Sequence, residues 1–375
     1  MKEHFLHKKL QERKDAQAFR QLQPASGLID FCSNDYLGIV KNGLLEQTAG
    51  AGNGRYCHGS TGSRLLSGNS ALAEATEALI ANFHDAEAAL IFNSGYDANT
   101  GLLSCVPQRG DTIVYDQLCH ASIRDGVRLS FAQAFSFRHN DLQDLQDKLR
   151  TATGQVFVVT ESIFSMDGDE APLKDMVAMC ERHDACLIVD EAHATGISGN
   201  KGEGLVQAMA LHKNCFARVH TFGKAMGAHG AAVVGSSLLR DYLVNFSRQF
   251  IYTTALPELS IAGIKQAYTI IPSLHEERRQ LWKLAQDFQS IAAGMGCSVM
   301  KTATPIQGII IPGNEAVKQT AARLQENGFD ARPILYPTVP KGSERIRIVL
   351  HSFNTVDEVS ALLQVVSRNH KSVNL

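Results

Sequence analysis

The chain reads His220-Thr221-Phe222-Gly223-Lys224-Ala225-Met226-Gly227-Ala228-His229-Gly230 between two apolar runs that are typical of β-strands. Three glycines surround Lys224, and glycine allows the backbone to approach another group closely. A lysine in such a place can be desolvated, lose its proton and attack a carbonyl group. Most lysines beside glycines are solvated turn residues instead, so this segment alone leaves both interpretations open.

A second polar motif follows an apolar run upstream. Cys186-Leu187-Ile188-Val189 is predicted to be a buried strand, and it ends in Asp190-Glu191-Ala192-His193. Open α/β sheets bind ligands at the carboxyl ends of their parallel strands. Asp190 could pair there with a protonated ring nitrogen, and His193 could stack on or hydrogen-bond the same ring. Pyridoxal phosphate (PLP) needs such groups beside a Schiff-base lysine and a phosphate cradle. The alternative is that Asp190 caps a turn and His193 is an ordinary buried histidine.

Strand-like runs alternate with helix-like segments through the middle of the chain. The runs at 88–92, 111–115 and 155–160 are each followed by a polar motif, as the 186–189 run is. This alternation predicts a mainly parallel sheet with right-handed crossovers, and it brings the polar motifs to one edge of the sheet. After the 88–92 run, Ser94-Gly95-Tyr96 opens a helix whose first N–H groups could cradle a phosphate.

The last third of the chain has a different pattern. A long helical stretch from about 258 to 295 is expected to lead into a smaller α+β domain. That domain has predicted strands at 308–311 and 345–350, a helix at 317–327 closed by Gly328, and a last helix opened by a Thr355–Glu358 capping box. We therefore predict an N-terminal helix and edge segment over 1–45, a large domain over 46–255 and a small domain over 256–375. The N-terminal helix, from Lys2 to about Arg20, is expected to dock an apolar side on the main body.

Composition excludes several classes of partner. The 36 Lys and Arg residues nearly balance the 38 Asp and Glu residues, so we expect neither nucleic acid nor an anionic membrane as a partner. The 8 cysteines have no Cys-x-x-Cys spacing and are expected to be reduced. No apolar run approaches the ~18 residues of a membrane span. The sequence thus predicts a soluble, cytoplasmic protein without a metal site.

Eight motifs, in order along nearly the whole chain, resemble those of one family. They are Ser33-Asn34-Asp35-Tyr36-Leu37-Gly38, Gly59-Ser60-Thr61-Gly62-Ser63-Arg64, Asn93-Ser94-Gly95-Tyr96, His120-Ala121-Ser122, Ser165-Met166-Asp167-Gly168, Asp190-Glu191-Ala192-His193, Thr221-Phe222-Gly223-Lys224 and Pro337-Thr338-Val339-Pro340. The family is that of the α-oxoamine synthases, fold-type-I PLP-dependent transferases that condense an amino acid with an acyl-CoA and release carbon dioxide. The resemblance implies the α/β fold of that class, with a mainly parallel sheet in the large domain and a smaller α+β C-terminal domain.

The resemblance also implies catalytic and cofactor-binding residues. Lys224 would carry the cofactor and act as a base, and Asp190 would keep the pyridine nitrogen protonated. His120 would stack on the cofactor ring, while Ser165 and His193 would hydrogen-bond its phenolic oxygen or adjacent groups. The remaining cofactor-binding candidates are Ser94, Gly95, Tyr96, Thr221 and Thr254.

The family's substrate residues and assembly carry over in the same way. Thr254 lies in a segment that crosses the dimer interface in the family, which implies a homodimer with the active site at the interface. Arg347 would bind the carboxylate of the amino acid, for which a guanidinium fork is suited. Arg345, on the same strand face, is expected to be a structural ion-pair partner. The other substrate-binding candidates are Arg20 near the acyl chain, Asn34 and Thr338.

Within the family, Phe222 and Ala192 are similar to the branch that condenses L-alanine with pimeloyl-CoA in biotin biosynthesis. Two alternatives stay open. One is another branch that joins glycine or serine to a different acyl-CoA, as in the formation of 2-amino-3-ketobutyrate or 5-aminolevulinate. The other is a non-catalytic PLP-binding protein that keeps the fold.

Overall fold

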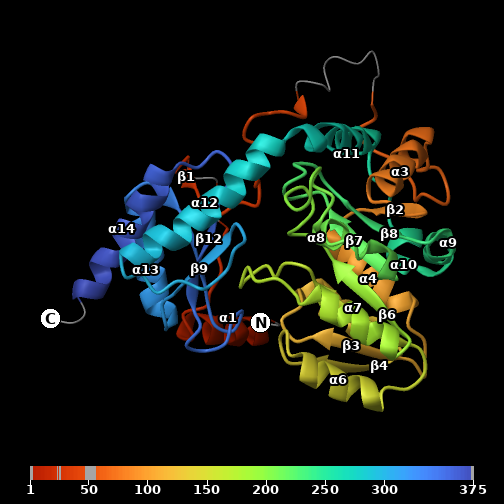
Figure 1. Cartoon of the computed structure of the whole chain (residues 1–375), viewed down its shortest axis with the longest axis horizontal. Coiled ribbons are helices and arrows are strands. Elements are labelled where there is room, and N and C mark those ends of the chain that lie inside the picture. The colour runs from red at the N-terminus through yellow and green to blue at the C-terminus, as the bar shows by residue number, and fades with distance from the viewer. Residues whose placement is uncertain (1–2, 23, 25–26, 47–55, 373–375) are drawn as a thin grey trace. The chain divides into compact units, whose positions relative to one another are not determined.

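A computed structural model describes residues 3–22, 24, 27–46 and 56–372 of the chain (Figure 1). The chain forms two compact units. The smaller unit comprises Met1–Asn34, Met166–Asp169 and Arg279–Leu375, and the larger comprises Asp35–Ser165 and Glu170–Arg278. The ends of these units differ from the predicted boundaries at 45 and 255. One reason is that α11 (Glu258–Ile270) packs on α3 (Ala71–Phe83) and so belongs to the larger unit.

The larger unit is built on a seven-stranded sheet with the order β2-β8-β7-β6-β5-β3-β4. All neighbouring pairs are parallel except those that β8 makes with β7 and β2. The predicted α/β architecture with a mainly parallel sheet is therefore confirmed. The strands are β2 Ala88–Phe92, β3 Thr112–Asp116, β4 Gln133–Phe137, β5 Val156–Glu161, β6 Ala185–Asp190, β7 Ala217–Thr221 and β8 Ala231–Gly235.

Helices cover this sheet. Besides α3 and α11 they are α4 Gly95–Cys105, α5 Ala121–Leu129, α6 Leu142–Thr151, α7 Leu173–Arg182, α8 Leu205–Ala208, α9 Ser237–Phe246 and α10 Arg248–Ile251, with short 3-10 turns at His212–Asn214 and Ile271–Ser273. Helices α4 and α5 pack on each other, and α4 also contacts β2, β7 and β8. Helix α7 contacts β6, while α6 contacts β3 and β4.

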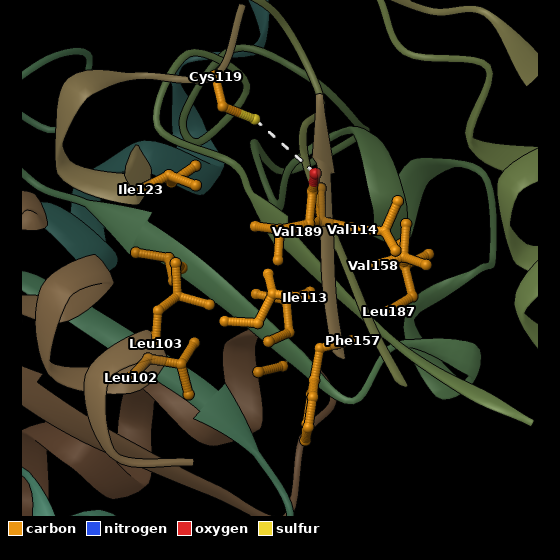
Figure 2. Packing of buried hydrophobic residues seen from close by; sticks show 14 of the residues in the cluster. Leu102, Leu103, Ile113, Val114, Cys119, Ile123, Phe157, Val158, Leu187 and Val189 are labelled. Carbon is orange, nitrogen blue, oxygen red and sulfur yellow. Dashed lines mark hydrogen bonds between the residues drawn. The ribbon is translucent and has the colours of Figure 1, made fainter. Parts of the chain in front are cut away.

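The core of the larger unit lies between these helices and the sheet (Figure 2). Leu102 and Leu103 of α4 and Ile123 of α5 are completely buried. They belong to the same cluster as buried side chains from both faces of β3, β5 and β6, labelled in Figure 2 as Ile113, Val114, Phe157, Val158, Leu187 and Val189. Cys119 lies in this cluster and directs its Sγ to the carbonyl oxygen of Val159 at 3.8 Å. The eight cysteines are all free thiols, as expected.

The smaller unit contains the predicted α+β domain. An antiparallel sheet has the order β11-β12-β9, and β1 pairs in parallel with β10. The capping box of the last helix is confirmed, because Thr355 N donates to Glu358 Oε2 at 2.8 Å and Glu358 N donates to Thr355 Oγ1 at 3.1 Å. The elements are α1 His4–Asp15, β1 Ile29–Asp30, β9 Ile306–Ile310, α13 Asn314–Glu326, β10 Phe329–Asp330, β11 Arg332–Ile334, β12 Arg345–Val349 and α14 Val356–Ser372, and the chain enters this unit within α12 His275–Gly294.

Two predicted helices need correction. The first ends at Asp15 rather than near Arg20, because Gln17 adopts a left-handed backbone conformation with φ 53°. It has no buried residue, and its Phe5 is 64% exposed, so no apolar side of it is docked within the described part of the chain; Lys2 lies outside that part. The helix predicted from about 258 to 295 is split into α11 and α12, because Pro272 lacks the N–H that a continuous helix needs.

Two further observations bear on the sequence predictions. Strand β4 was not predicted, because its residues Gln133–Phe137 are mostly exposed at the sheet edge and do not form an apolar run. Among the described helices, none combines the length and the apolar character that crossing a membrane requires.

Candidate active site

A cavity of about 250 Å³ lies in the larger unit, where the carboxyl ends of β2, β3, β5, β6 and β7 meet. Eight of the predicted catalytic and cofactor-binding residues line it, namely Ser94, Gly95, Tyr96, His120, Asp190, His193, Thr221 and Lys224. Ser165 and Thr254 are not among the described residues that line it. The sheet edge therefore brings together polar motifs that are up to 130 positions apart in the sequence.

Lys224 follows β7 in a tight loop. The loop is closed by hydrogen bonds from Phe222 N to Gly230 O and from Ala228 N to Phe222 O, both 2.9 Å long. Gly227 and Gly230 have φ values of 62° and 114°, which favour glycine. This backbone places the lysine amine 2.9 Å from Nε2 of His193.

His193 bridges Lys224 and a tyrosine. Its Nδ1 lies 2.8 Å from the hydroxyl of Tyr36, which is completely buried, and His193 itself is only 4% exposed. A hydroxyl can donate or accept, and a neutral imidazole does one at each nitrogen. The Tyr36–His193–Lys224 chain can therefore reverse the direction of its hydrogen bonds when the lysine amine gains or loses a proton.

Asp190 ends β6 and is 5% exposed at the cavity. Its Oδ1 accepts a hydrogen bond from Ala192 N at 2.8 Å, and its Oδ2 accepts one from Nδ2 of Asn99 at 2.7 Å. These bonds hold a carboxylate in a place where it can face a cationic ring nitrogen.

Glu161 is a second carboxyl group at the cavity. It ends β5 directly opposite Asp190 in the sheet register, and its Oε1 accepts a hydrogen bond from His120 N at 2.5 Å. Burial, and next the charge of Asp190, raise the pKa of Glu161. This carboxyl group therefore keeps its proton to higher pH than an ordinary glutamate.

His120 precedes α5 and caps it, because its Nδ1 accepts a hydrogen bond from Ser122 N at 3.2 Å. Burial lowers the pKa of His120, Lys224 and Arg124 lower it further, and the charge of Asp190 opposes them. The ring is accordingly neutral near pH 7, which suits a side chain that stacks on an aromatic cofactor.

The part of the cavity lined by Ser94, Gly95 and Thr221 has the features of a phosphate cradle. Ser94 caps α4, and its Oγ accepts a hydrogen bond from Asp97 N at 3.0 Å. The N–H groups of a first helical turn have no partner within the helix and attract anions. A Cβ atom added at Gly95 would lie 2.4 Å from Cγ2 of Thr221, so only glycine fits there.

Thr221 supplies a direct test of whether a phosphate-bearing cofactor fits. Its Oγ1 is buried beside the cradle and finds no hydrogen-bond partner among the described residues. A buried hydroxyl without a partner is costly, and a phosphate oxygen would satisfy it. The lysine amine, the carboxylate of Asp190 and this cradle are the donor and acceptor set that PLP requires.

The comparisons with known proteins agree with this geometry. The sequence profile described as "Aminotransferase class I and II" matches residues 26–363. The chain belongs to this family.

Similar proteins indicate which branch of this family the chain belongs to. The chain is 39% identical over 374 residues to a putative 8-amino-7-oxononanoate synthase of Bacillus licheniformis, which covers 99% of this chain and 98% of the relative. It is 39% identical over 394 residues to the 8-amino-7-oxononanoate synthase of Emericella nidulans, covering 96% and 94% of the two chains. The chain is thus an α-oxoamine synthase, a PLP-dependent C-acyltransferase, as the motifs implied.

Two solved structures have the same fold. The serine palmitoyltransferase of S. paucimobilis, with a bound PLP–myriocin aldimine, aligns with a TM-score of 0.90 and 26% identity over 100% of this chain and 98% of its own. The 8-amino-7-oxononanoate synthase of Francisella tularensis aligns with a TM-score of 0.81 and 29% identity over 93% and 99%. The fold class and the cofactor, pyridoxal 5′-phosphate, are therefore confirmed.

The four predicted substrate residues belong to the smaller unit and form two pairs there. Nη2 of Arg347, on β12, donates to Oδ1 of Asn34 at 3.1 Å. Nη2 of Arg20 donates to Oγ1 of Thr338 at 3.3 Å. Arg347 is 9% exposed, whereas Arg20 and Thr338 are exposed. Arg345 is an ion-pair partner as predicted, and its carboxylate is that of Asp167.

Sequence reasoning missed four residues of the site. The sequence places Tyr36 only in a turn motif, and no pattern in it assigns a role to Glu161, Asn99 or Ser122. A signal existed for Glu161, because it ends a predicted strand beside the strand of Asp190. Asn99 lies one helical turn beyond the cradle, which alone does not indicate what it contacts.

Proposed function

We propose that this enzyme is an 8-amino-7-oxononanoate synthase, which condenses L-alanine with pimeloyl-CoA in biotin biosynthesis and releases CoA and carbon dioxide. The observation that carries the proposal is the 39% identity, over nearly the whole chain, to relatives with this name. The cavity supports the chemistry, because it offers an amine, a carboxylate, a neutral imidazole and a phosphate cradle.

When bound, PLP supplies an electron sink for the electron pair that is left when the Cα–H bond of the amino acid breaks. Ser94, Gly95, Tyr96 and Thr221, which line the cavity, would hold its phosphate. Asp190 would pair with the ring nitrogen, and His120 would stack on the ring. Ser165 and His193 would act on the phenolic side, a role that for both residues rests on the family motifs.

Lys224 is the residue that binds the cofactor and then takes the Cα proton of the amino acid. Its amine is 2.9 Å from Nε2 of His193, so a proton on the amine can be shared with the imidazole. Tyr36 holds the far side of this imidazole at 2.8 Å. This chain keeps the amine oriented in both of its protonation states, as a general base and later as a general acid.

Substrate binding is assigned to the smaller unit. Arg347 grips the carboxylate of L-alanine through two parallel N–H groups, and Asn34 fixes the plane of the guanidinium. Arg20 meets the terminal carboxylate of the pimeloyl chain, and Thr338 holds the arginine side chain. The assembly proposed is a homodimer in which Thr254 of one subunit reaches the phosphate site of the other. A cytoplasmic location stays a prediction.

A second candidate is another α-oxoamine synthase, with glycine or serine and a different acyl-CoA. The observation in its favour is the TM-score of 0.90 to a serine palmitoyltransferase. A non-catalytic PLP-binding protein is the candidate of another class. Against it stand the intact Lys224, Asp190, His120, His193 and Arg347.

The deciding experiment measures the CoA thiol released by the purified, PLP-loaded protein. Pimeloyl-CoA and palmitoyl-CoA are each offered with L-alanine, glycine or L-serine. We expect release with L-alanine and pimeloyl-CoA well above the other five combinations. Release with serine and palmitoyl-CoA instead would replace the proposed substrates. If no pair releases thiol, a panel of shorter and longer acyl-CoAs separates another α-oxoamine synthase, which releases thiol from one of them, from the non-catalytic protein, which releases it from none.

A further inference from the structure

A continuous chain of hydrogen bonds joins Asp190 to His120 in the wall of the cavity. Nδ2 of Asn99 donates to Asp190 Oδ2 at 2.7 Å and to Ser122 Oγ at 3.0 Å. Ser122 Oγ in turn lies 2.8 Å from Nδ1 of His120. Asn99 is 3% exposed and Ser122 is 1% exposed, so bulk water does not compete for these bonds.

The charge of Asp190 sets the direction of the first bond. A carboxylate can only accept hydrogen bonds, so the amide of Asn99 must turn its NH2 group, and not its oxygen, towards Asp190. That NH2 group has two hydrogens, and the second one points to Ser122 Oγ. The oxygen and nitrogen of a side-chain amide are difficult to distinguish by position alone. For Asn99 the hydrogen-bond partners decide which atom is the nitrogen.

The same direction continues to the histidine. Because Ser122 Oγ accepts from Asn99, its own hydrogen can be donated, and the partner at 2.8 Å is His120 Nδ1. A second donor acts on the same atom, because the backbone N–H of Ser122 lies 3.2 Å from Nδ1. A nitrogen that accepts these bonds carries no proton, so the proton of the neutral ring is on Nε2.

The charged groups around the His120 ring do not move its proton from Nε2 to Nδ1. Asp190 and Asp125 favour a protonated ring, Lys224 and Arg124 disfavour it, and burial disfavours it most, so that the pKa of His120 is lowered. Glu161 contacts the backbone N–H of His120 and not its ring. A ring with a single proton must choose one nitrogen, and the relay decides which.

We propose that Asn99 and Ser122 are positioning residues that use the negative charge of Asp190 to hold His120 in its Nε2–H tautomer. His120 lines the cavity, and its Nδ1 is occupied by Ser122. Nε2–H is then the ring group that donates to an oxygen of a bound molecule, such as a carboxylate or a thioester carbonyl. This use of the donor rests on the proposed function, whereas the tautomer itself does not.

The test is ¹⁵N NMR of the protein labelled in its histidine rings, with and without PLP and without substrate. His120 is assigned among the 14 histidines as the ring whose signals are missing in a His120→Gln variant. We expect the Nε2–H tautomer in the wild-type protein. In Ser122→Ala and in Asn99→Leu the ratio of the two tautomers should shift towards Nδ1–H by about fivefold, as the loss of one ordinary hydrogen bond predicts.

Thr76→Val is the matched control. Thr76 is completely buried and donates its hydroxyl to Leu72 O at 2.7 Å on α3, so its loss should leave the His120 tautomer unchanged. A wild-type His120 with its proton on Nδ1 would overturn the proposal, even if neither variant folds. So would an unchanged tautomer ratio in both folded variants. Absence of thiol release from a wild-type protein whose His120 carries its proton on Nε2 would count against the proposed function and not against the relay.

Discussion

The two units arrange their functional groups in different ways. In the larger unit, Lys224, His193 and Tyr36 form one hydrogen-bonded chain, and Asp190 is connected to His120 through another. In the smaller unit, the predicted substrate residues form two separate pairs, and the Arg20–Thr338 pair is exposed. The exposed Arg20–Thr338 pair can therefore change at lower cost than the buried hydrogen-bonded chains of the larger unit. Substitution of Lys224 in the larger unit should remove a function, and substitutions of the predicted substrate residues in the smaller unit should shift affinity.

The largest effect is expected for Lys224→Ala. This variant should lose the Schiff-base absorbance, and its kcat should fall by a factor of about 10⁴ or more. The reason is that both the covalent link and the proton acceptor are removed. Absorbance spectroscopy and thiol release measure the two losses. A variant that keeps the absorbance band and the activity would break the assignment of the larger unit.

Arg347→Ala tests the smaller unit. Removal of a guanidinium that holds a carboxylate should raise KM for L-alanine by about 10² to 10³, with the Schiff-base absorbance unchanged. Arg347→Lys keeps the charge but not the fork, and should lie between the variant and the wild type. Equal KM values in all three proteins would show that Arg347 does not bind the amino acid.

The buried carboxyl group of Glu191 makes stability depend on pH. Burial raises the pKa of Glu191 to about 7, whereas in the unfolded chain it lies near ~4.3. Between these values the unfolded chain has lost a proton that the folded chain keeps, so the free energy of unfolding falls as pH rises, by about 4 kcal/mol in total. The decrease should end above about pH 7.

Glu191→Gln isolates this contribution, because the glutamine does not titrate. Urea unfolding of both proteins at pH 5, 6, 7 and 8 should give a difference in stability that moves in favour of the variant as pH rises. Glu161 is present in both proteins, so its own contribution to the pH dependence cancels in the difference. A difference that is constant with pH would contradict a raised pKa for Glu191.

Gly95→Ala should weaken the cradle. Its Cβ would lie 2.4 Å from Thr221 Cγ2, and the shift that relieves this contact should raise the dissociation constant of PLP by about tenfold. Gly263→Ala is the control, because nothing lies within 4 Å of its added Cβ and the residue is inside α11. The control should bind PLP as the wild type does and be more stable by about 0.5–1 kcal/mol.

The smallest effect is expected for Arg20→Ala. Because Arg20 is exposed, we expect KM for pimeloyl-CoA to rise by only about two- to fivefold. An acyl-CoA of equal length without the terminal carboxylate serves as the matched substrate, and its KM should not change. An equal rise for both substrates would mean that Arg20 does not recognise the carboxylate.

Much of the larger unit could be predicted from sequence because its strands are short apolar runs that end in polar motifs. The helix cap at Ser94 and the strand ends at Asp190 and Thr221 follow from local patterns, and parallel strands bring such ends to one edge. The roles of these residues came from the family motifs and not from the patterns.

What could not be predicted depends on contacts between distant segments. Nothing near Asn99 in the sequence indicates that its amide meets Asp190, which lies 91 positions away. Arg345 was predicted to need an ion-pair partner, but the choice of Asp167 is set by the fold. The break at Pro272 was a local signal that the helical periodicity on both sides outweighed.

Helix α4 also fixes the distance and the rotation between two parts of the site. It begins at the cradle residue Gly95, and Asn99 follows four residues later, which corresponds to about 6 Å along the axis and slightly more than one turn. One residue inserted between them would turn Asn99 by about 100° away from Asp190, although every side chain of the site would still be present. The spacing between the two residues is therefore as much a part of the active site as their identities, and it should tolerate no insertion or deletion.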